Sequence, residues 1–177
     1  MKVIETREKM IEIFEKNLKI AELGVFEGEF SKIINEVCQP KELYLVDLFE
    51  GYFGSGDKNR KNYHYVQLES EMEKLIDYFK TDNKVKIIKS STTDFLNNLE
   101  KDYLDIVYID ADHSYTSVLN DLELSYPKIK SGGMICGHDY VPKTEAEKAV
   151  NDFCIKFNVN IDYITKDGCP SFCIIKK

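Results

Sequence analysis

Five short apolar runs, each followed by a helix-length segment, limit the folds available to this chain. The runs cover residues 19–23, 43–46, 85–88, 104–109 and 134–136. Between them, apolar residues recur three or four positions apart, as in Phe30, Ile33 and Val37, a spacing typical of amphipathic helices. Alternating strands and helices favour a parallel sheet with helices on both faces.

Both ends of the chain depart from this alternation. Four apolar residues near the start share one helical face: Ile4, Ile11, Phe14 and Leu18. We therefore expect an opening helix. Residues 159–164 and 172–175 are strand-like and are joined by a turn that contains Asp167, which predicts a closing hairpin. The pattern predicts an α/β fold with a seven-stranded, mostly parallel sheet, helices on both faces and an antiparallel C-terminal hairpin strand, in a single domain spanning residues 1–177.

Charge and composition exclude several classes of partner. The net charge of −7 argues against nucleic acid as a partner. The one local basic cluster, Lys58–Arg60–Lys61, is too small to form a nucleic-acid-binding face. The longest apolar runs are strand-length, so we expect no membrane partner. The start of the chain lacks the apolar stretch of a signal peptide, which predicts a cytoplasmic protein. The five cysteines form no CxxC pair, so we expect reduced structural thiols and no zinc site.

Residues 49–65 form the longest stretch without periodicity, and they are rich in glycine and aromatic residues. Long ordered loops tend to be functional. We expect residues 52–62 to order over the site when a substrate binds. The alternative is a plain connection between two regular elements.

Small and acidic residues follow the first three apolar runs. Gly24 and Gly28 allow a tight turn, and Asp47 stands at the next strand end, where a carboxylate can accept both hydroxyls of a ribose. Each feature alone is also typical of an ordinary loop, but together they favour a nucleoside-bearing ligand. Ser91 and Thr92 fit either contact with an adenine edge or a helix N-cap.

The fourth and fifth runs end in carboxylates and imidazoles. These residues are Asp110, Asp112, His113, His138 and Asp139. The carboxyl ends of neighbouring parallel strands meet at one crevice, so we expect the five side chains to lie together. Oxygen-rich sets with imidazole suit Mg²⁺, Mn²⁺ or a similar divalent ion.

Three segments resemble a known family. IAELGVFEG, LYLVDLFEG and VYIDADHSYTSVLNDLELSYPKIKSGGMICGHDY are similar to class I S-adenosylmethionine-dependent methyltransferases. They most resemble the small methyltransferases that include macrocin-type sugar O-methyltransferases and cephalosporin-hydroxylase-like proteins. The similarity spans residues 19–141, and residues 107–140 are its specific part. It implies a Rossmann-like fold that binds S-adenosylmethionine.

The resemblance also implies roles for single residues. The residues implied to bind the cofactor are Glu22, Gly24, Phe26, Gly28, Asp47, Ser91, Thr92 and Asp110. Phe26 stands where the commoner motif has a middle glycine, which is usual for this group. In metal-dependent relatives, the equivalents of Asp110, His138 and Asp139 bind Mg²⁺, and the equivalent of His113 is the general base. His138 departs from the glutamate of several relatives, which leaves a metal site with one softer ligand.

The resemblance predicts O-methylation of a small hydroxylated acceptor, such as a sugar or polyol. The catalytic residues would be His113 and Asp110. Because the chain is short for its group, we expect the 49–65 loop and a second copy of the chain to cover the acceptor. The main alternative is a non-catalytic module that binds S-adenosylmethionine or S-adenosylhomocysteine. A nicotinamide dehydrogenase and a metal-dependent hydrolase fit less of the pattern.

Overall fold

The computed structural model describes residues 1–50 and 68–177. The predicted cover at 52–62 and the cluster Lys58–Arg60–Lys61 therefore lie outside the described residues. Within the described ranges, no helix combines the length and the apolar composition that crossing a bilayer requires.

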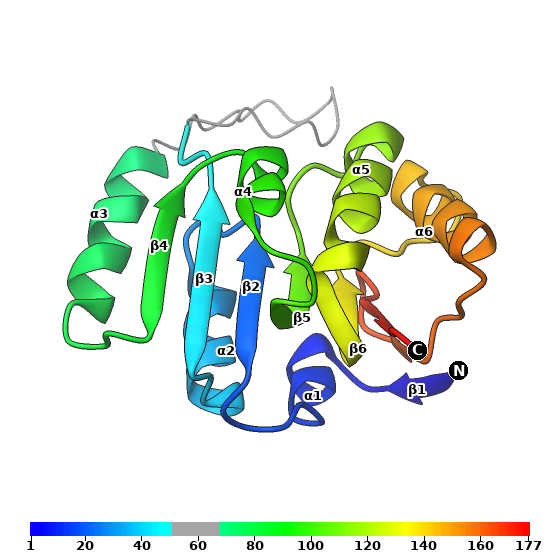
Figure 1. Cartoon of the computed structure of the whole chain (residues 1–177), viewed down its shortest axis with the longest axis horizontal. Helices are drawn as coiled ribbons and strands as arrows, with labels where there is room; N and C mark the ends of the chain where they lie inside the picture. Colours follow the sequence, from blue (N-terminus) through cyan, green and yellow to red (C-terminus); the bar gives the residue numbers. More distant parts are fainter. Residues whose placement is uncertain (51–67) are drawn as a thin grey trace.

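The described residues form one sheet of eight strands (Figure 1). The strands are β1 (Lys2–Ile4), β2 (Lys19–Leu23), β3 (Glu42–Asp47), β4 (Val85–Lys89), β5 (Leu104–Ile109), β6 (Ile129–Gly137), β7 (Tyr163–Thr165) and β8 (Phe172–Ile175). Their spatial order is β1-β7-β8-β6-β5-β2-β3-β4. β8 pairs antiparallel with β6 and β7, and the other pairings are parallel. The predicted mostly parallel sheet with an antiparallel C-terminal strand is confirmed.

Helices cover both faces of the sheet, as predicted. They are α1 (Arg7–Ile11), α2 (Glu29–Cys38), α3 (Leu68–Phe79), α4 (Thr92–Asn98), α5 (Tyr115–Ser125) and α6 (Glu145–Phe157), with a short 3₁₀ turn at Tyr126–Lys128. One apolar cluster joins α1, α2 and α3 to one face, and a second joins α4, α5 and α6 to the other. Both clusters are built from the side chains that the apolar runs supply, so the sheet is buried on both sides.

The predicted opening helix is present only in part, since a strand precedes it. β1 pairs with β7, and α1 is only five residues long. The amide of Lys2 donates to the carbonyl of Asp162 at 2.6 Å, and residues Lys2–Ile4 therefore form a strand at the edge of the sheet. Thr6 then starts α1, because its hydroxyl accepts from the amide of Lys9 at 3.3 Å. This strand gives the sheet one strand more than the predicted seven.

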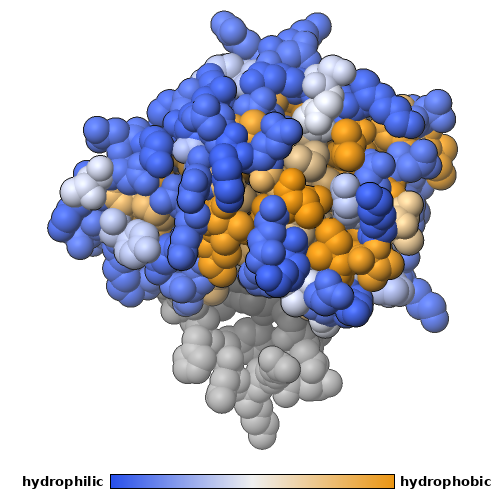
Figure 2. Space-filling model, turned by 90° about the horizontal axis from the view of Figure 1, so that it is seen from below, coloured by the Kyte–Doolittle hydropathy of each residue, from blue (hydrophilic) through white to orange (hydrophobic). Residues whose placement is uncertain are grey.

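Two strand boundaries also differ from the prediction. β6 begins at Ile129 and runs through Gly133, where an added Cβ would lie 2.5 Å from the carbonyl oxygen of Asp105. Gly132 and Gly133, which precede the predicted strand, therefore lie inside a longer strand whose register shifts against β5. β7 covers Tyr163–Thr165 rather than residues 159–164. Seen from below, the surface is mainly hydrophilic, with hydrophobic areas across the middle of the face (Figure 2).

The strand order reverses between β2 and β5, and we call the region outside the carboxyl ends of these strands the crevice. The chain passes from β2 to β3 and β4 in one direction, and from β5 to β6 in the other. Ligands of open α/β sheets bind where the order reverses, outside the carboxyl ends of the strands. The residues that follow β2 and β5 are therefore the ones that line this crevice.

The core on the α6 side yields a stability prediction. Phe153 is fully buried, and its ring lies 5.7 Å from that of Tyr126 and 4.6 Å from that of Phe157. Phe153→Ala should lower the free energy of unfolding by about 3–5 kcal/mol, because it removes buried area and leaves a cavity. The matched control is Ile155→Ala, since Ile155 lies on the same helix and is 79% exposed. Urea unfolding that shows equal losses for the two variants would contradict this packing.

Candidate functional site

The main chains at the ends of β2 and β5 are in direct contact. Gly24 has φ +89°, and an added Cβ would lie 2.2 Å from the carbonyl oxygen of Asp110 and 2.6 Å from Cα of Ala111. The amide of Asp110 donates to the carbonyl of Leu23 at 2.7 Å. The tight turn predicted at Gly24 is present. Its requirement for glycine comes from the neighbouring strand end, whatever ligand lies above it.

Asp47 holds the loop between β2 and α2. One of its oxygens accepts from the amides of Val25 at 2.7 Å and Phe26 at 3.0 Å, and the other accepts from the amide of Phe49 at 2.8 Å. Phe26 has φ 52° and is 48% exposed at this loop. The structure therefore gives Asp47 a role in shaping the turn, beside the predicted role on a ribose.

Gly28 begins α2 without a side-chain cap. It has φ 76°, and an added Cβ would lie 2.3 Å from the side chain of Leu75 on α3. A non-glycine residue would have to displace that leucine. The first amides of α2 have no side-chain cap at this position, and such amides point toward the carboxyl edge of the sheet.

Glu22 lies beneath the same loop and is 2% exposed. Its carboxylate accepts from the hydroxyl of Ser31 on α2. Burial raises the pKa of Glu22 to about 8, the Ser31 hydrogen bond opposes this change, and the charge of Asp110 adds to it. Glu22 is therefore held largely protonated at neutral pH in this environment.

Ser91 and Thr92 already have partners within the protein. The hydroxyl of Ser91 accepts from the amide of Asp94 at 3.0 Å, so the N-cap interpretation is confirmed for this residue. Thr92 donates to Oδ1 of Asp121 at 2.7 Å. Asp121 is 2% exposed, and burial raises its pKa to about 6 against the effect of the Thr92 hydrogen bond. The predicted adenine contact remains a prediction.

Four of the five residues predicted at the ends of β5 and β6 lie together. Nε2 of His113 is 3.1 Å from Oδ2 of Asp139. Nδ1 of His138 is 3.6 Å from Oδ1 of Asp110 and 3.5 Å from Oδ2 of Asp139. Asp110, His113, His138 and Asp139 therefore form one cluster, which we call the strand-end cluster. Asp139 has φ 55°, a strained conformation of the kind that gathers at functional sites.

Asp112 is turned away from the strand-end cluster, contrary to expectation. It accepts from the amide of Ser114 at 3.0 Å and from the hydroxyl of Ser117 at 2.8 Å. These contacts lower its pKa, the amide of Ser114 most strongly. The start of α5 attracts this carboxylate because the first amides of a helix need acceptors.

Hydrogen bonds set the charges in the strand-end cluster. Burial opposes a charge on His138, but the bonds to Asp110 and Asp139 outweigh burial and raise its pKa to about 9. The same contact with His138 lowers the pKa of Asp139 to about 2. A positive imidazolium therefore lies between two carboxylates.

The donor atoms fit a divalent ion. One ligand atom from each of Asp110, His113 and Asp139 lies within 4.8 Å of the other two. Three such donors can converge on one ion. His138 also faces both carboxylates, so the two histidines compete for the third position, where the sequence analysis expects His138.

Two further residues reach this region and were missed by the sequence analysis. Arg7 donates from Nη1 to Oδ2 of Asp110 at 3.3 Å. Cys169, which is exposed, hydrogen-bonds Asp139; partial burial and that carboxylate raise the pKa of its thiol. The expectation of structural thiols suits Cys38, Cys136 and Cys173, which are buried. No periodic pattern marks Arg7 or Cys169, because their contacts join segments that are far apart in the sequence.

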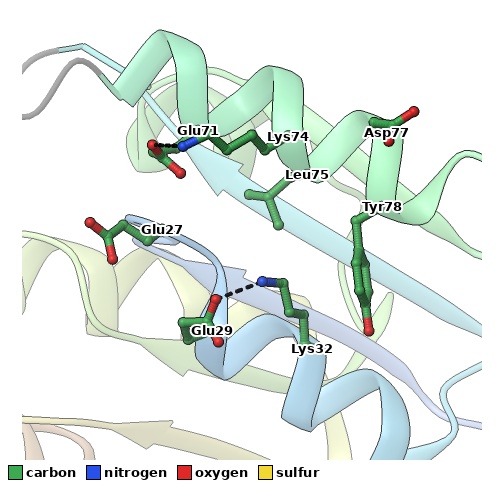
Figure 3. Close-up of a pocket in the computed structure, with 8 residues that line it drawn as sticks. All are labelled: Glu27, Glu29, Lys32, Glu71, Lys74, Leu75, Asp77 and Tyr78. Atoms are coloured by element: carbon green, nitrogen blue, oxygen red, sulfur yellow. Dashed lines mark hydrogen bonds and ion pairs between the residues drawn. The ribbon is translucent and has the colours of Figure 1, made fainter.

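A pocket of about 410 Å³ lies between α2 and α3, apart from the strand-end cluster (Figure 3). Its lining residues are Glu27, Glu29, Lys32, Glu71, Lys74, Leu75, Asp77 and Tyr78. The charged pairs Glu29–Lys32 and Glu71–Lys74 are each 2.6 Å apart, so both cations already have partners. None of the residues predicted to bind the cofactor or to act in catalysis lines this pocket.

Solved structures share this fold. The O-methyltransferase NovP matches with a TM-score of 0.71 and 18% identity, over 97% of this chain and 79% of its own. Aeropyrum pernix fibrillarin, solved with natively bound S-adenosylmethionine, matches with a TM-score of 0.64 and 11% identity, over 91% of this chain and 67% of its own. The B. subtilis tRNA methyltransferase TrmK matches with a TM-score of 0.66 and 8% identity, over 98% of this chain and 67% of its own. The architecture is that of the Rossmann-like methyltransferases.

A family profile described as "Methyltransferase domain" matches residues 21–140. The chain belongs to this family, within the class I S-adenosylmethionine-dependent methyltransferases. An uncharacterized protein of Acanthamoeba polyphaga mimivirus is 29% identical over 134 residues, which are 75% of this chain. The match covers 57% of that relative's length.

The buried Glu22 predicts a pH dependence of stability. Its pKa of about 8 in the fold exceeds the ordinary value of 4.5, so between these values the folded state holds a proton that the unfolded state has lost. Its contribution is therefore complete below pH 4.5 and falls by up to about 1.4 kcal/mol per pH unit as the pH rises toward 8. Glu22→Gln should remove this decline, as urea unfolding at several pH values can show. Glu29→Gln is the exposed control, and parallel curves for the wild type and Glu22→Gln would contradict the assignment.

Proposed function

We propose that this protein transfers the methyl group of S-adenosylmethionine to a hydroxyl of a small acceptor, such as a sugar or polyol. The observation that carries the proposal is the pairing of His113 with Asp139 at 3.1 Å in the strand-end cluster, whose Asp110 lies against the turn at Gly24. A methyl donor above that turn and a base in the strand-end cluster would face the same crevice. The net charge of −7 favours a small neutral acceptor over the RNA acceptors of some proteins that share the fold.

The cofactor would lie across the ends of β2, β3 and β4. We assign its binding to Glu22, Gly24, Phe26, Gly28, Asp47, Ser91, Thr92 and Asp110. Asp47 suits the ribose through Oδ1, because that oxygen accepts one loop amide and can accept a second hydrogen bond, whereas Oδ2 already accepts two. Ser91 and Thr92 follow β4, at a distance along the sheet edge that suits the adenine.

The chemistry needs alignment and the removal of one proton. The acceptor oxygen bonds to the methyl carbon, the carbon–sulfur bond breaks with its electron pair on sulfur, and S-adenosylhomocysteine leaves. Asp139 lies within hydrogen-bonding distance of Nε2 of His113, which would place the proton on Nε2 and leave Nδ1 to accept the proton of the acceptor hydroxyl. His113 is 47% exposed, so an acceptor can reach it.

A divalent ion, Mg²⁺ or Mn²⁺, would be held by Asp110, His138 and Asp139, and its binding would displace the proton of the His138 imidazolium. Bound there, it would lower the pKa of acceptor hydroxyls and orient them. His113 offers an alternative third ligand, since its donor atom lies with those of Asp110 and Asp139. A second copy of the chain as part of the acceptor cover stays a prediction.

The ribose assignment predicts a selective loss of affinity. Asp47→Ala should weaken binding of S-adenosylhomocysteine by about 1–3 kcal/mol, the scale of a lost charge-assisted hydrogen bond. Because Asp47 also shapes the loop, calorimetry should compare adenosine with 2′,3′-dideoxyadenosine. The variant should lose affinity for adenosine and little for the dideoxy compound. Equal losses for both nucleosides would show that Asp47 only shapes the loop and does not bind the ribose. Asp102→Ala, at an exposed residue, is the control.

The base assignment predicts a loss of turnover without a loss of cofactor. His113→Ala should lower turnover about 100-fold or more, measured as S-adenosylhomocysteine released with a panel of sugars and polyols. Its affinity for S-adenosylhomocysteine should stay within about twofold, because the base acts on the acceptor. An unchanged rate would exclude His113 as the base. If the wild type binds S-adenosylhomocysteine but methylates no acceptor, the non-catalytic binding module becomes the better explanation.

The metal assignment has its own readout. Calorimetry with Mn²⁺ should show binding that is lost in Asp110→Asn and Asp139→Asn. His138→Ala should weaken Mn²⁺ binding more than His113→Ala does. The reverse order would make His113 the third ligand, and turnover that survives chelation would remove the ion from catalysis.

A further inference from the structure

Three contacts hold the side chain of Arg7 at the crevice. Its Nη1 donates to Oδ2 of Asp110 at 3.3 Å, and its guanidinium carbon lies 4.2 Å from the ring centre of Phe30 on α2. Tyr108 on β5 is a further neighbour, and its hydroxyl raises the pKa of Arg7. The side chain remains 27% exposed, so it is fixed in position without being sealed from the crevice.

The main chain of Arg7 is fixed as well. β1 brings the segment to the edge of the sheet, and the amide of Arg7 donates to Oδ2 of Asp167 at 3.2 Å. Asp167 is itself bound by the hydroxyl of Thr165 at 2.5 Å. The N-terminal segment and the turn between β7 and β8 therefore place this residue together.

Arg7 brings a positive charge to a region whose neighbouring ionisable groups are acidic. The crevice at the end of β2 and β5 is acidic, with Asp110 beside the buried Glu22, and the charge of Arg7 lowers the pKa of Glu22 against the effect of burial. Among the lysine and arginine ion pairs of the described ranges, the pair of Arg7 is the one that reaches the strand-end cluster. A guanidinium is always charged and offers five N–H donors, more than Asp110 can take.

A guanidinium and a carboxylate side by side are complementary to a zwitterion. S-adenosylmethionine carries an α-amino acid end, with one ammonium and one carboxylate group. Carboxylates are bound best by the planar fork of an arginine, and ammonium groups by carboxylates. Of the two groups that meet at 3.3 Å, Asp110 lies directly against the glycine turn through its main chain.

We propose that Arg7 binds the carboxylate of the amino acid end of the cofactor, while Asp110 binds its ammonium group. The proposal rests on the proposed function, since it assumes this cofactor. It assigns a ligand contact to a residue outside the matched range of 21–140. The competing explanation is that the Arg7–Asp110 pair only attaches the N-terminal segment to the sheet.

The test compares two nucleosides that differ in one group. S-adenosylhomocysteine has both the ammonium and the carboxylate, and S-adenosyl-3-thiopropylamine lacks the carboxylate. Calorimetry on the wild type should show at least about tenfold tighter binding of S-adenosylhomocysteine, the scale of a charge-assisted hydrogen bond. Arg7→Gln should bind S-adenosylhomocysteine about 10- to 100-fold more weakly and the thiopropylamine equally or more tightly. Arg7→Lys, which keeps the charge but loses the fork, should fall between the two.

The matched control is Lys9→Gln. Lys9 lies on the same helix, and its ammonium pairs with Glu12 at 2.7 Å instead of the crevice. This variant should keep both affinities. The ratio of the two affinities within each variant also separates binding from folding, because a partly unfolded sample loses binding-competent protein for both ligands alike.

Three outcomes would overturn the proposal. If the wild type binds the two nucleosides equally, Arg7 does not bind the carboxylate, although the cofactor assignment stands. If Arg7→Gln weakens both to the same degree, the ion pair only holds the N-terminal segment. If the wild type binds neither nucleoside, the proposed function itself fails.

Discussion

The close approach of two main chains, at Gly24 after β2 and Asp110 after β5, is the constraint on which the site depends. Contact at 2.2 Å between a notional Cβ of Gly24 and the carbonyl of Asp110 leaves room for glycine alone. The turn at Gly24 and the first carboxylate of the strand-end cluster are consequently fixed to each other by backbone. Neither can shift without opening the parallel pairing of β2 with β5, so the distance between the turn and the cluster is a property of the sheet.

Asp110 also organises the charges around this contact. Its Oδ2 faces Arg7, and its Oδ1 faces His138. Arg7 and His138 therefore face different oxygens of one carboxylate. The buried Glu22 lies beneath and is kept neutral by the loss of water, so it adds no further negative charge at neutral pH. Carboxylates could otherwise not gather here without mutual repulsion.

The parts of the fold that the sequence predicts correctly are those in which local pattern and burial agree. The apolar runs of β2 and β5 are buried on both faces, and the helix Glu145–Phe157 begins where Thr144 caps it. The strand-end cluster was predictable because parallel strands end at one edge. The opening strand was not, since its pairing with β7 lies some 160 positions away and the apolar spacing of the segment suits a helix equally well. Arg7 and the Thr92–Asp121 pair were missed for the same reason, since each joins distant segments.

The pairing of β1 with β7 affects the order in which the contacts of the crevice form during synthesis. The turn at Gly24 and the strand-end cluster are encoded between residues 19 and 139, and their strands can pair as soon as β6 has formed. Arg7 reaches Asp110 only when β1 lies against β7 and Asp167, which follow Arg7 by about 160 positions in the chain. Contacts of such long sequence separation form late, because the entropy cost of closing a large loop comes before the contact can stabilise the fold. A nascent chain can therefore pair β2, β5 and β6 before Arg7 reaches Asp110, and the contact between Arg7 and Asp110 forms only after β7 has been synthesised and paired with β1.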